Sequence, residues 1–312
     1  MEIEGKNILI TGGAGFIGSH IVDLFKDKNK VFVLDNLSAG RKENILGIPL
    51  TIKSVHDIGE EDVKGKDIVI HAAAQVSTFL SVDYPYEDFK SNCLGTFKVF
   101  EACRKWNDDA IIVYTSSRSV LGEIPKPNLA DETLPYDPST FYNVHKIYGE
   151  LLCKIYSGLY GMKFIVLRPS NVYGPRQPYW KKGWYNFISF WIKLALEGKP
   201  LPIFGTGDQV RDYVNVVDTA RAYVLALSNK KAIGETFLLP SGRGTDLKDL
   251  SSSVIKLSNS KSKVDFFPPR KGDIQRFIGA YGKAKAMLGW VPQISLEDGL
   301  KKEIEWVRSD IK

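Results

Sequence analysis

The fold of this chain is decided by the stretch TGGAGFIG at residues 11–18, which joins an apolar run to a helix-like pattern. Gly12 permits a tight turn, Gly15 lets the backbone approach a pyrophosphate, and Gly18 allows close packing of helix on strand. Backbone N–H groups at the start of the helix would face the phosphates, with the helix dipole behind them. The predicted cradle comprises Gly12, Gly15, Phe16, Ile17 and Gly18.

A carboxylate stands at the end of the next predicted strand. Asp35 follows Gly18 by 17 residues, close to the spacing at which dinucleotide folds place an acidic residue on the ribose. Its carboxylate would accept hydrogen bonds from the ribose hydroxyls and would repel a 2′-phosphate. The sequence therefore predicts that the cofactor is NAD rather than NADP.

The first half of the chain alternates short β-branched runs with helix-period segments, which is typical of a parallel, doubly wound α/β sheet. The candidate strands are 7–11, 30–35, 51–54, 68–71, 110–114 and 163–168. Long amphipathic helices are expected near 86–106 and 139–160. We predict a Rossmann-like dinucleotide-binding domain at 1–168, a smaller and mainly substrate-binding region at 169–312, and a return of the chain to the sheet near 205–235.

Composition narrows the possible partners. The chain has 312 residues and a net charge of +6, and its Lys and Arg are interspersed with Asp and Glu. Short basic clusters, at Lys181-Lys182 and from Lys261 to Lys263, indicate a solvated face, so no nucleic-acid partner is expected. The three cysteines lack CxxC or metal-ligand spacing, which predicts free thiols, no metal and a cytoplasmic location. No secretory signal or membrane-length apolar run occurs, so no membrane partner is expected.

Tyr142 and Lys146 stand four residues apart in a helical pattern and therefore share one face. Such pairs also occur by chance on helix surfaces. Here Ser117 follows the carboxyl end of the fifth predicted strand, at the edge where open α/β sheets hold their ligands. The three residues are therefore the candidate catalytic set.

Chemistry gives each member of this set a role. A free phenol has a pKa near 10, about three units too high for a base at pH 7, and closing that gap takes about 4 kcal/mol. The Lys146 ammonium and a positive nicotinamide would favour the phenolate. Tyr142 could then take a proton from a sugar hydroxyl while hydride leaves the same carbon for NAD, with Ser117 hydrogen-bonded to the reacting oxygen.

These residues resemble the extended short-chain dehydrogenase/reductase family, and within it the nucleotide-sugar epimerases. The resemblance covers essentially the whole chain. Besides the segments already quoted, it rests on 35–38, 57–58, 71–75, Asn92, 168–177, 205–212, 270–273 and 288–292.

The resemblance implies further roles. Asp57 and Ile58 should flank the adenine. A nucleotide-diphosphate sugar, with a UDP-sugar favoured, would be the substrate, and two arginines would clamp its diphosphate because a guanidinium fork suits phosphate oxygens. The further cofactor residues are Asn36, Ser38, Asp57, Ile58, Ala72, Ala73, Ala74 and Asn92, and the substrate residues are Ser117, Asn171, Arg211, Arg270 and Asp273. Helices near 86–106 and 139–160 would pair in a homodimer.

Some positions depart from the family pattern. Leu121 stands where a Tyr is usual, His145 replaces a common Ser, and the segment 237–240 lacks the usual Asn. The loop 179–185 is rich in aromatic residues, and its Gly183-Trp184 is similar to CDP-sugar 2-epimerases. The sugar and its reacting carbon are therefore less well defined than the cofactor.

The reaction expected from these features is C4 epimerisation of a UDP-hexose of the UDP-glucose/UDP-galactose type, through a transient 4-keto intermediate. Ser117-Arg118 stands where the family's 4,6-dehydratases place Asp-Glu, so elimination is not expected. The alternatives are a CDP-sugar 2-epimerase, a UDP-glucuronate epimerase, a nucleotide-sugar dehydrogenase or reductase, and a non-catalytic NAD-binding sensor.

Overall fold

The structure is a computed structural model that describes residues 3–180 and 187–311. The Lys181-Lys182 cluster and the Gly183-Trp184 pair, which the sequence singled out, lie outside the described residues. Within the described ranges, no helix combines the length and the apolar character that crossing a membrane requires.

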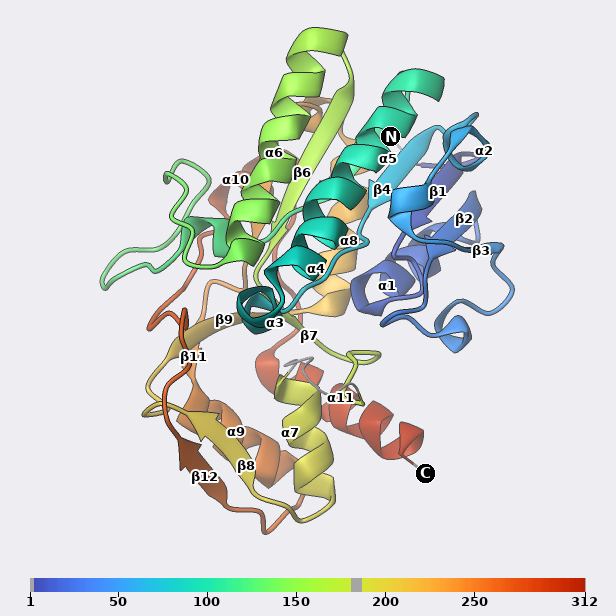
Figure 1. Cartoon of the computed structure of the whole chain (residues 1–312). Coiled ribbons are helices and arrows are strands. Elements are labelled where there is room, and N and C mark those ends of the chain that lie inside the picture. Colours follow the sequence, from blue (N-terminus) through green and yellow to red (C-terminus); the bar gives the residue numbers. More distant parts are fainter. Residues whose placement is uncertain (1–2, 181–186, 312) are drawn as a thin grey trace.

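A seven-stranded sheet with the order β10-β6-β5-β4-β1-β2-β3 forms the centre of the molecule, and all its pairs are parallel (Figure 1). Its strands are β1 (Asn7–Thr11), β2 (Lys30–Asp35), β3 (Leu50–Ile52), β4 (Ile68–His71), β5 (Ile111–Thr115), β6 (Lys163–Pro169) and β10 (Thr236–Leu239). The order reverses between β1 and β4, which is the switch point where such folds bind ligands. The predicted Rossmann-like α/β class is confirmed, with the third and fifth strands shifted by one or two residues.

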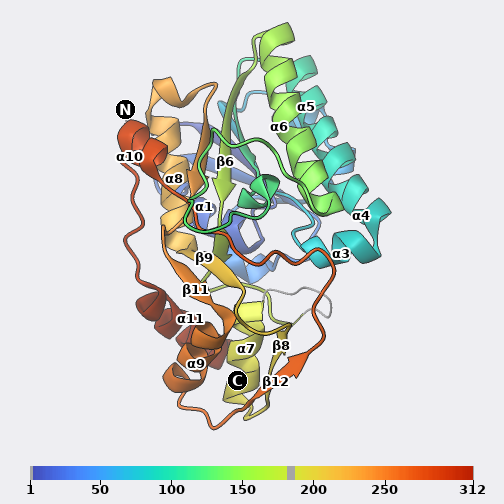
Figure 2. The ribbon, with the colours of Figure 1, turned by 90° about the vertical axis from the view of Figure 1, so that its left-hand side faces the viewer.

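Helices cover both faces of this sheet (Figure 2). On one face α1 (Phe16–Phe25) packs against α8 (Val216–Ser228), and the other face carries α2 (Glu60–Val63), α5 (Gly95–Trp106) and α6 (Phe141–Tyr160). Apolar side chains at helical spacing, such as Ile21 and Phe25 of α1, are fully buried against the strands. Both faces of the central strands are therefore buried, as their almost wholly apolar sequences require, whereas the edge strand β3 is largely exposed.

The boundaries of α6 follow from its end residues. The Thr140 side chain accepts a hydrogen bond from the backbone N–H of Asn143 and so caps the first turn. Gly161 ends the helix in the left-handed conformation, with φ of 70°. These two signals place Tyr142 in the first turn, at the end of α6 that meets the ligand edge of the sheet.

The long helix predicted near 86–106 consists of three parts. α4 (Pro85–Phe89) continues into a π-helical turn, η3 (Lys90–Leu94), and then into α5. The carbonyl of Lys90 accepts from the Gly95 N–H and also lies 2.7 Å from His56 Nε2. His56 thus contacts the widened turn from a separate segment. The sequence predicted one continuous helix here, because the sequence pattern of a π-turn is almost that of an α-helix.

A smaller layer lies below the carboxyl ends of the strands (Figure 1). It contains a three-stranded sheet, β11-β9-β7, and a parallel pair, β12-β8. The strands are β7 (Asn171–Tyr173), β8 (Leu201–Phe204), β9 (Val210–Asn215), β11 (Gly244–Asp246) and β12 (Val264–Phe267). The helices α7 (Phe187–Leu196), α9 (Leu247–Leu257) and α11 (Leu296–Asp310) pack together around a separate apolar cluster.

The chain crosses between the two layers more than once. After β9 it returns through α8 to β10, which pairs with β6 at the edge of the large sheet. The remaining short elements are η1 (Lys42–Ile45), η2 (Val55–Asp57), α3 (Thr78–Asp83), η4 (Arg118–Leu121), η5 (Lys230–Ala232) and α10 (Gly282–Leu288). Trp290, which is fully buried, donates its indole N–H to the Asp218 carbonyl and fixes the segment after α10 against α8.

Candidate active site

A cavity of about 950 Å³ lies at the carboxyl edge of the large sheet, between that sheet and the smaller layer. Its wall combines residues that follow six parallel strands with residues of α7, β8, β9 and the segment that contains Arg270 and Asp273. A volume of this size is at the upper end of the range for ligand pockets. The cavity therefore has room for a ligand larger than a single nucleotide.

The glycine-rich stretch forms the wall next to β1. Gly12 has a φ of +71°, and a Cβ there would stand 2.7 Å from the Cα of Ala73. A Cβ on Gly18 would collide with the carbonyl oxygen of Gly12. Helix α1 begins at Phe16, so the N–H groups of its first turn lie at the cavity. The backbone is thus shaped to approach an anion closely, as a dinucleotide pyrophosphate requires.

Asp35 lies at the end of β2 and lines the cavity together with Asn36 and Ser38. One carboxylate oxygen accepts the N–H of Ala14 at 3.0 Å and the other accepts the N–H of Leu37 at 2.8 Å. These bonds fix the side chain beside the glycine-rich stretch. Because a carboxylate oxygen can accept more than one hydrogen bond, this position suits a ribose diol.

The other predicted cofactor residues fall into two groups. The segment 72–74, which contains Ala72, Ala73 and Ala74, lines the cavity beside the glycine-rich stretch. Ile58 instead packs in the core below β4, Asp57 is exposed, and Asn92 is buried with its amide donating to Asp88. The residues 54–56 form the cavity wall there.

The candidate catalytic residues meet on the floor of the cavity. Tyr142 and Lys146 come from α6 and are 6% and 4% exposed, and Ser117 follows β5 and lies next to the Tyr142 hydroxyl. The Lys146 ammonium donates to the Thr115 carbonyl at 2.9 Å and lies 5.9 Å from the centre of the Tyr142 ring. The structure therefore brings together three residues from two separate segments, as the sequence predicts.

Burial governs the ionisation of this set. It raises the pKa of Tyr142 above its ordinary value, and the neighbouring Ser117 hydroxyl and the charge of Arg118 only partly oppose this shift. Burial also lowers the pKa of Lys146 to about 8, against the raising effect of Asp88 and Glu150. Without NAD, desolvation of the phenolate therefore outweighs the charges of the protein groups around it. The expectation that Lys146 and a positive nicotinamide together favour the phenolate stays a prediction.

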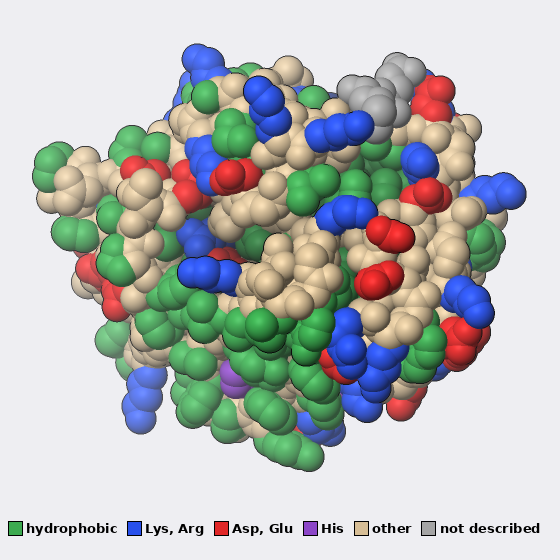
Figure 3. All heavy atoms as spheres, turned by 90° about the horizontal axis from the view of Figure 1, so that it is seen from above, with side chains coloured by type: hydrophobic (Ala, Val, Ile, Leu, Met, Phe, Trp, Pro, Cys, Tyr) green, Lys and Arg blue, Asp and Glu red, His purple; other side chains and the backbone are tan. Residues whose placement is uncertain are grey.

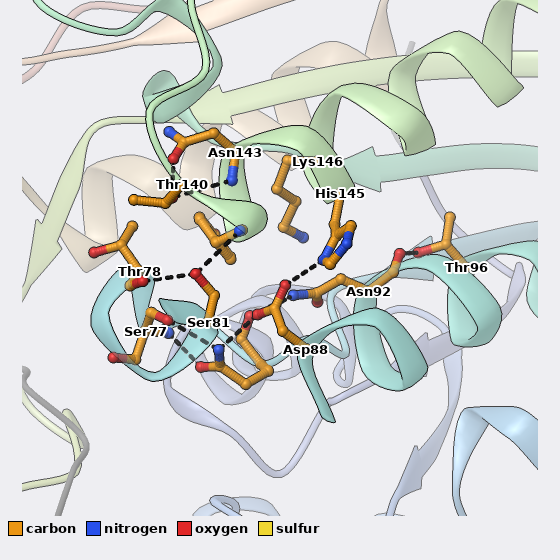
Figure 4. A network of polar contacts seen from close by, with 12 residues as sticks. Ser77, Thr78, Ser81, Asp88, Asn92, Thr96, Thr140, Asn143, His145 and Lys146 are labelled. Atoms are coloured by element: carbon orange, nitrogen blue, oxygen red, sulfur yellow. Dashed lines mark hydrogen bonds and ion pairs between the residues drawn. The ribbon is translucent and has the colours of Figure 1, made fainter. Parts of the chain in front are cut away.

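A polar network holds the beginning of α6 in place (Figure 4). Asp88 is fully buried, and its carboxylate lies 2.5 Å from His145 Nδ1 and accepts the amide of Asn92 at 3.0 Å. The hydroxyl of Ser81, from α3, accepts the backbone N–H of Tyr142 at 3.1 Å. His145 thus connects α6 to α4 next to the candidate catalytic residues.

The residues predicted to bind the substrate line the opposite wall. Asn171 of β7 donates to the Asp212 carbonyl at 3.1 Å. Arg211 of β9 donates to the Asp273 carboxylate at 2.5 Å, and the guanidinium of Arg270 lies 3.5 Å from the centre of the Phe204 ring. Positions far apart in the sequence therefore meet on one wall and place two cations at the cavity.

Two features of the cavity were missed from the sequence. Arg118 lines it directly beside Ser117 and donates to the Asn171 side chain at 3.2 Å. A wall of aromatic side chains consists of Phe187, Phe190, Trp191, Phe204 and Tyr213. Arg118 could have been found, because it follows Ser117 at the end of a strand whose carboxyl edge was already predicted to face the ligand.

Comparison with known proteins identifies relatives across the whole chain. Residues 8–239 match the NAD dependent epimerase/dehydratase family. The UDP-glucose 4-epimerase of Mycolicibacterium smegmatis is 34% identical over 96% of this chain and 98% of its own length. The structure of the UDP-glucose 4-epimerase of Thermotoga maritima with UDP-glucose is 36% identical, covers 98% of this chain and 100% of its own, and has a TM-score of 0.91. That of the Thermus thermophilus UDP-glucose 4-epimerase in complex with NAD is 34% identical, with a TM-score of 0.89 and coverage of 97% and 99%.

Proposed function

Because the chain belongs to the NAD dependent epimerase/dehydratase family, we propose that it interconverts the C4 epimers of a UDP-hexose of the glucose/galactose type or a close relative. The observation that carries this proposal is the meeting of Ser117, Tyr142 and Lys146 on the floor of a cavity whose wall is a phosphate cradle. The protein is an isomerase with NAD as its cofactor.

The shape of the cradle fits NAD. Gly12 and Gly18 leave space that any side chain would fill, and Asp35 stands where the adenosine ribose would lie. We infer that residues 1–168, with the returning segment 205–235, hold the cofactor, and that 169–312 mainly bind the substrate. Bound NAD supplies the acceptor that takes a hydride from C4 of the sugar and later returns it to the same carbon.

The chain's own residues handle the proton. As a phenolate, stabilised by the Lys146 ammonium and the positive nicotinamide, Tyr142 would accept the proton of the C4 hydroxyl as the carbonyl forms, and Ser117 would hydrogen-bond that oxygen throughout. The Lys146 ammonium is fixed by the Thr115 carbonyl, so its charge stays close to the phenol. After the 4-keto sugar has presented its other face, Tyr142 returns the proton and the cycle consumes no cofactor.

The opposite wall binds the nucleotide diphosphate. We propose that Arg211 and Arg270 meet the phosphates, with Asn171 beside them and Asp273 on a ribose or sugar hydroxyl. A 4,6-dehydration would need an additional acid and base beside Tyr142. The positions after β5 hold Ser117 and Arg118 instead, which favours epimerisation over elimination.

We also infer a homodimer through the α4–α5 segment and α6. The outer faces of these helices carry large apolar side chains, with Tyr86 at 67%, Ile155 at 49% and Leu159 at 70% exposure. Figure 3, which looks down on the ends of these helices, shows hydrophobic side chains gathered along one border of the molecule. Exposed patches of this kind mark interfaces. Sedimentation of an Ile155→Glu variant as a monomer would support this interface, and a monomeric wild type would exclude it.

The proposed location is the cytoplasm. Cys93, Cys103 and Cys153 are buried free thiols, and such thiols persist in a reducing compartment. Detection of the protein in an oxidising compartment of its native cell would contradict this part of the proposal.

A substrate panel tests the reaction. The purified protein, supplied with NAD, is incubated with UDP-glucose, UDP-galactose, UDP-glucuronate and CDP-sugars, and the products are identified by NMR and mass spectrometry. We expect a C4 epimer of one UDP-sugar and no net NADH. Stoichiometric NADH would indicate a dehydrogenase, and NAD binding without turnover of any sugar would indicate a sensor.

A further inference from the structure

Arg118 is a cation of the cavity that the proposed cycle does not use. It is the first residue of η4, directly after Ser117, and its part-buried side chain lines the cavity together with Tyr142. Burial and the charge of Arg211 lower the pKa of Arg118 to about 10, and Asp273 opposes this effect. Arg118 is therefore still charged at neutral pH, in a place where its charge is poorly hydrated.

The protein partners of this guanidinium are neutral. Arg118 donates to the side-chain oxygen of Asn171 at 3.2 Å, and its Cζ lies 4.8 Å from the centre of the Phe277 ring. Asp273 is already bonded to Arg211 at 2.5 Å. Across residues 3–180 and 187–311, Arg118 takes part in no ion pair. Because a poorly hydrated charge is costly without a counter-charge, we expect the ligand to supply one.

The position of Arg118 indicates which part of the ligand carries this counter-charge. Its charge acts on the Tyr142 phenol, whereas Arg270 lies on another wall, against the rings of Phe204 and Phe79. Under the proposed function Arg211 and Arg270 match the two phosphates. Arg118 is the third arginine of the described cavity lining, and it adjoins Ser117, the residue proposed to hold the reacting oxygen on C4. The substituent on the neighbouring ring carbon C5 would therefore lie within its reach.

Resting on the proposed C4 epimerisation, and narrowing its substrate to a close relative of the glucose/galactose type, we propose that Arg118 determines specificity by binding a carboxylate on the hexose. The preferred substrate is then a UDP-hexuronate rather than a neutral UDP-hexose. The guanidinium fork matches the two oxygens of a carboxylate in a way that a single hydroxymethyl group cannot. In a partly desolvated cavity such a pair discriminates strongly between a charged and a neutral C6 group.

The test compares UDP-glucuronate with UDP-glucose and UDP alone. Their dissociation constants, and kcat/KM for the two sugars, are measured with the NAD-loaded wild type and with Arg118→Ala, Arg118→Gln and Arg118→Lys. We expect the wild type to favour UDP-glucuronate, and Arg118→Ala to reduce the ratio of the two kcat/KM values by about 30-fold or more. Arg118→Lys should retain part of the preference, because it keeps the charge but not the fork.

The control variant is Arg270→Ala, which should weaken UDP, UDP-glucose and UDP-glucuronate alike. A wild type that prefers UDP-glucose overturns the proposal. So does an Arg118→Ala variant that weakens UDP as much as UDP-glucuronate, because Arg118 would then serve the diphosphate. Arg118→Gln retains a donor for Asn171 and replaces Arg118→Ala if the latter fails to fold. If no sugar is turned over, the proposed function fails, but the binding constants still decide for or against Arg118.

Discussion

The buried ion pair between Glu150 and Arg168 gives a stability prediction that can be worked out from the structure. Glu150 of α6 and Arg168 of β6 are 6% and 5% exposed. The Glu150 carboxylate accepts Arg168 Nε at 2.9 Å and Nη2 at 2.6 Å, the Ser116 hydroxyl at 2.5 Å and the Tyr136 hydroxyl at 2.9 Å. The pair thus joins α6, which carries Tyr142, to the strand ends beneath the cavity.

Glu150→Gln removes the charge and leaves the Arg168 guanidinium buried without a counter-charge. Breaking a buried pair in this way costs about 3–5 kcal/mol, which is a large part of a typical total stability of about 5–15 kcal/mol. We expect the free energy of unfolding in urea to fall by this amount. The matched control is Glu101→Gln. Glu101 also pairs with an arginine, Arg104 at 2.7 Å, but in a more exposed setting, so about 1 kcal/mol or less should be lost.

Removal of both charges separates the effect of an unpaired buried charge from the effect of lost packing. In Glu150→Leu/Arg168→Met no charge is left unpaired, so stability should return to within about 1 kcal/mol of the wild type or exceed it. If Glu150→Gln loses no more stability than Glu101→Gln, the pair does not hold α6 to β6 as described. A double variant as unstable as Glu150→Gln would show that packing, rather than an uncompensated charge, causes the loss.

Three further predictions concern the site. Gly12→Ala puts a Cβ 2.7 Å from the Ala73 backbone, at a residue whose own φ is +71°, so the backbone of the glycine-rich stretch must shift. NAD affinity measured by titration should therefore fall about 100-fold or more. An unchanged affinity would contradict the proposed phosphate-binding role of this stretch. Asp35→Ala should lower the ratio of NADP to NAD dissociation constants by about 10-fold, and an unchanged ratio would contradict a ribose role. Burial lowers the pKa of Lys146 to about 8, so between that pH and the ordinary pKa of lysine the unfolded chain binds more protons than the folded chain, and folding becomes more favourable as pH rises. The unfolding free energy of the wild type minus that of Lys146→Met should therefore be larger at pH 10 than at pH 7.5. A smaller difference at pH 10 would contradict the lowered pKa.

Patterns local in the sequence allowed much of the fold to be predicted. The glycine-rich stretch, the strand ending at Asp35 and the four-residue spacing of Tyr142 and Lys146 each depend on neighbouring residues. Their chemistry is tied to backbone geometry, which is why strand ends and a helix face could be placed before the structure was known.

The features of the fold and of the site that could not be predicted depend on partners that are distant in sequence. The π-turn at η3 involves His56, and the network behind α6 pairs Asp88 with His145, 57 residues later. The net shift in the pKa of Tyr142 likewise depends on how deeply α6 buries it, which no pattern specifies. The role of Arg118 likewise depends on a distant partner, because its contact with Asn171, 53 residues later, places its side chain at the cavity.

The most direct test of the account is the turnover of its preferred UDP-sugar by Tyr142→Phe. The variant should bind NAD like the wild type and lose about 10²–10⁴-fold in kcat, because only the proton-transfer group is removed. Tyr148→Phe, on the same helix but away from the cavity lining, should keep the wild-type rate. A Tyr142→Phe enzyme with the wild-type kcat would contradict the claim that this phenol is the acid and base of the reaction.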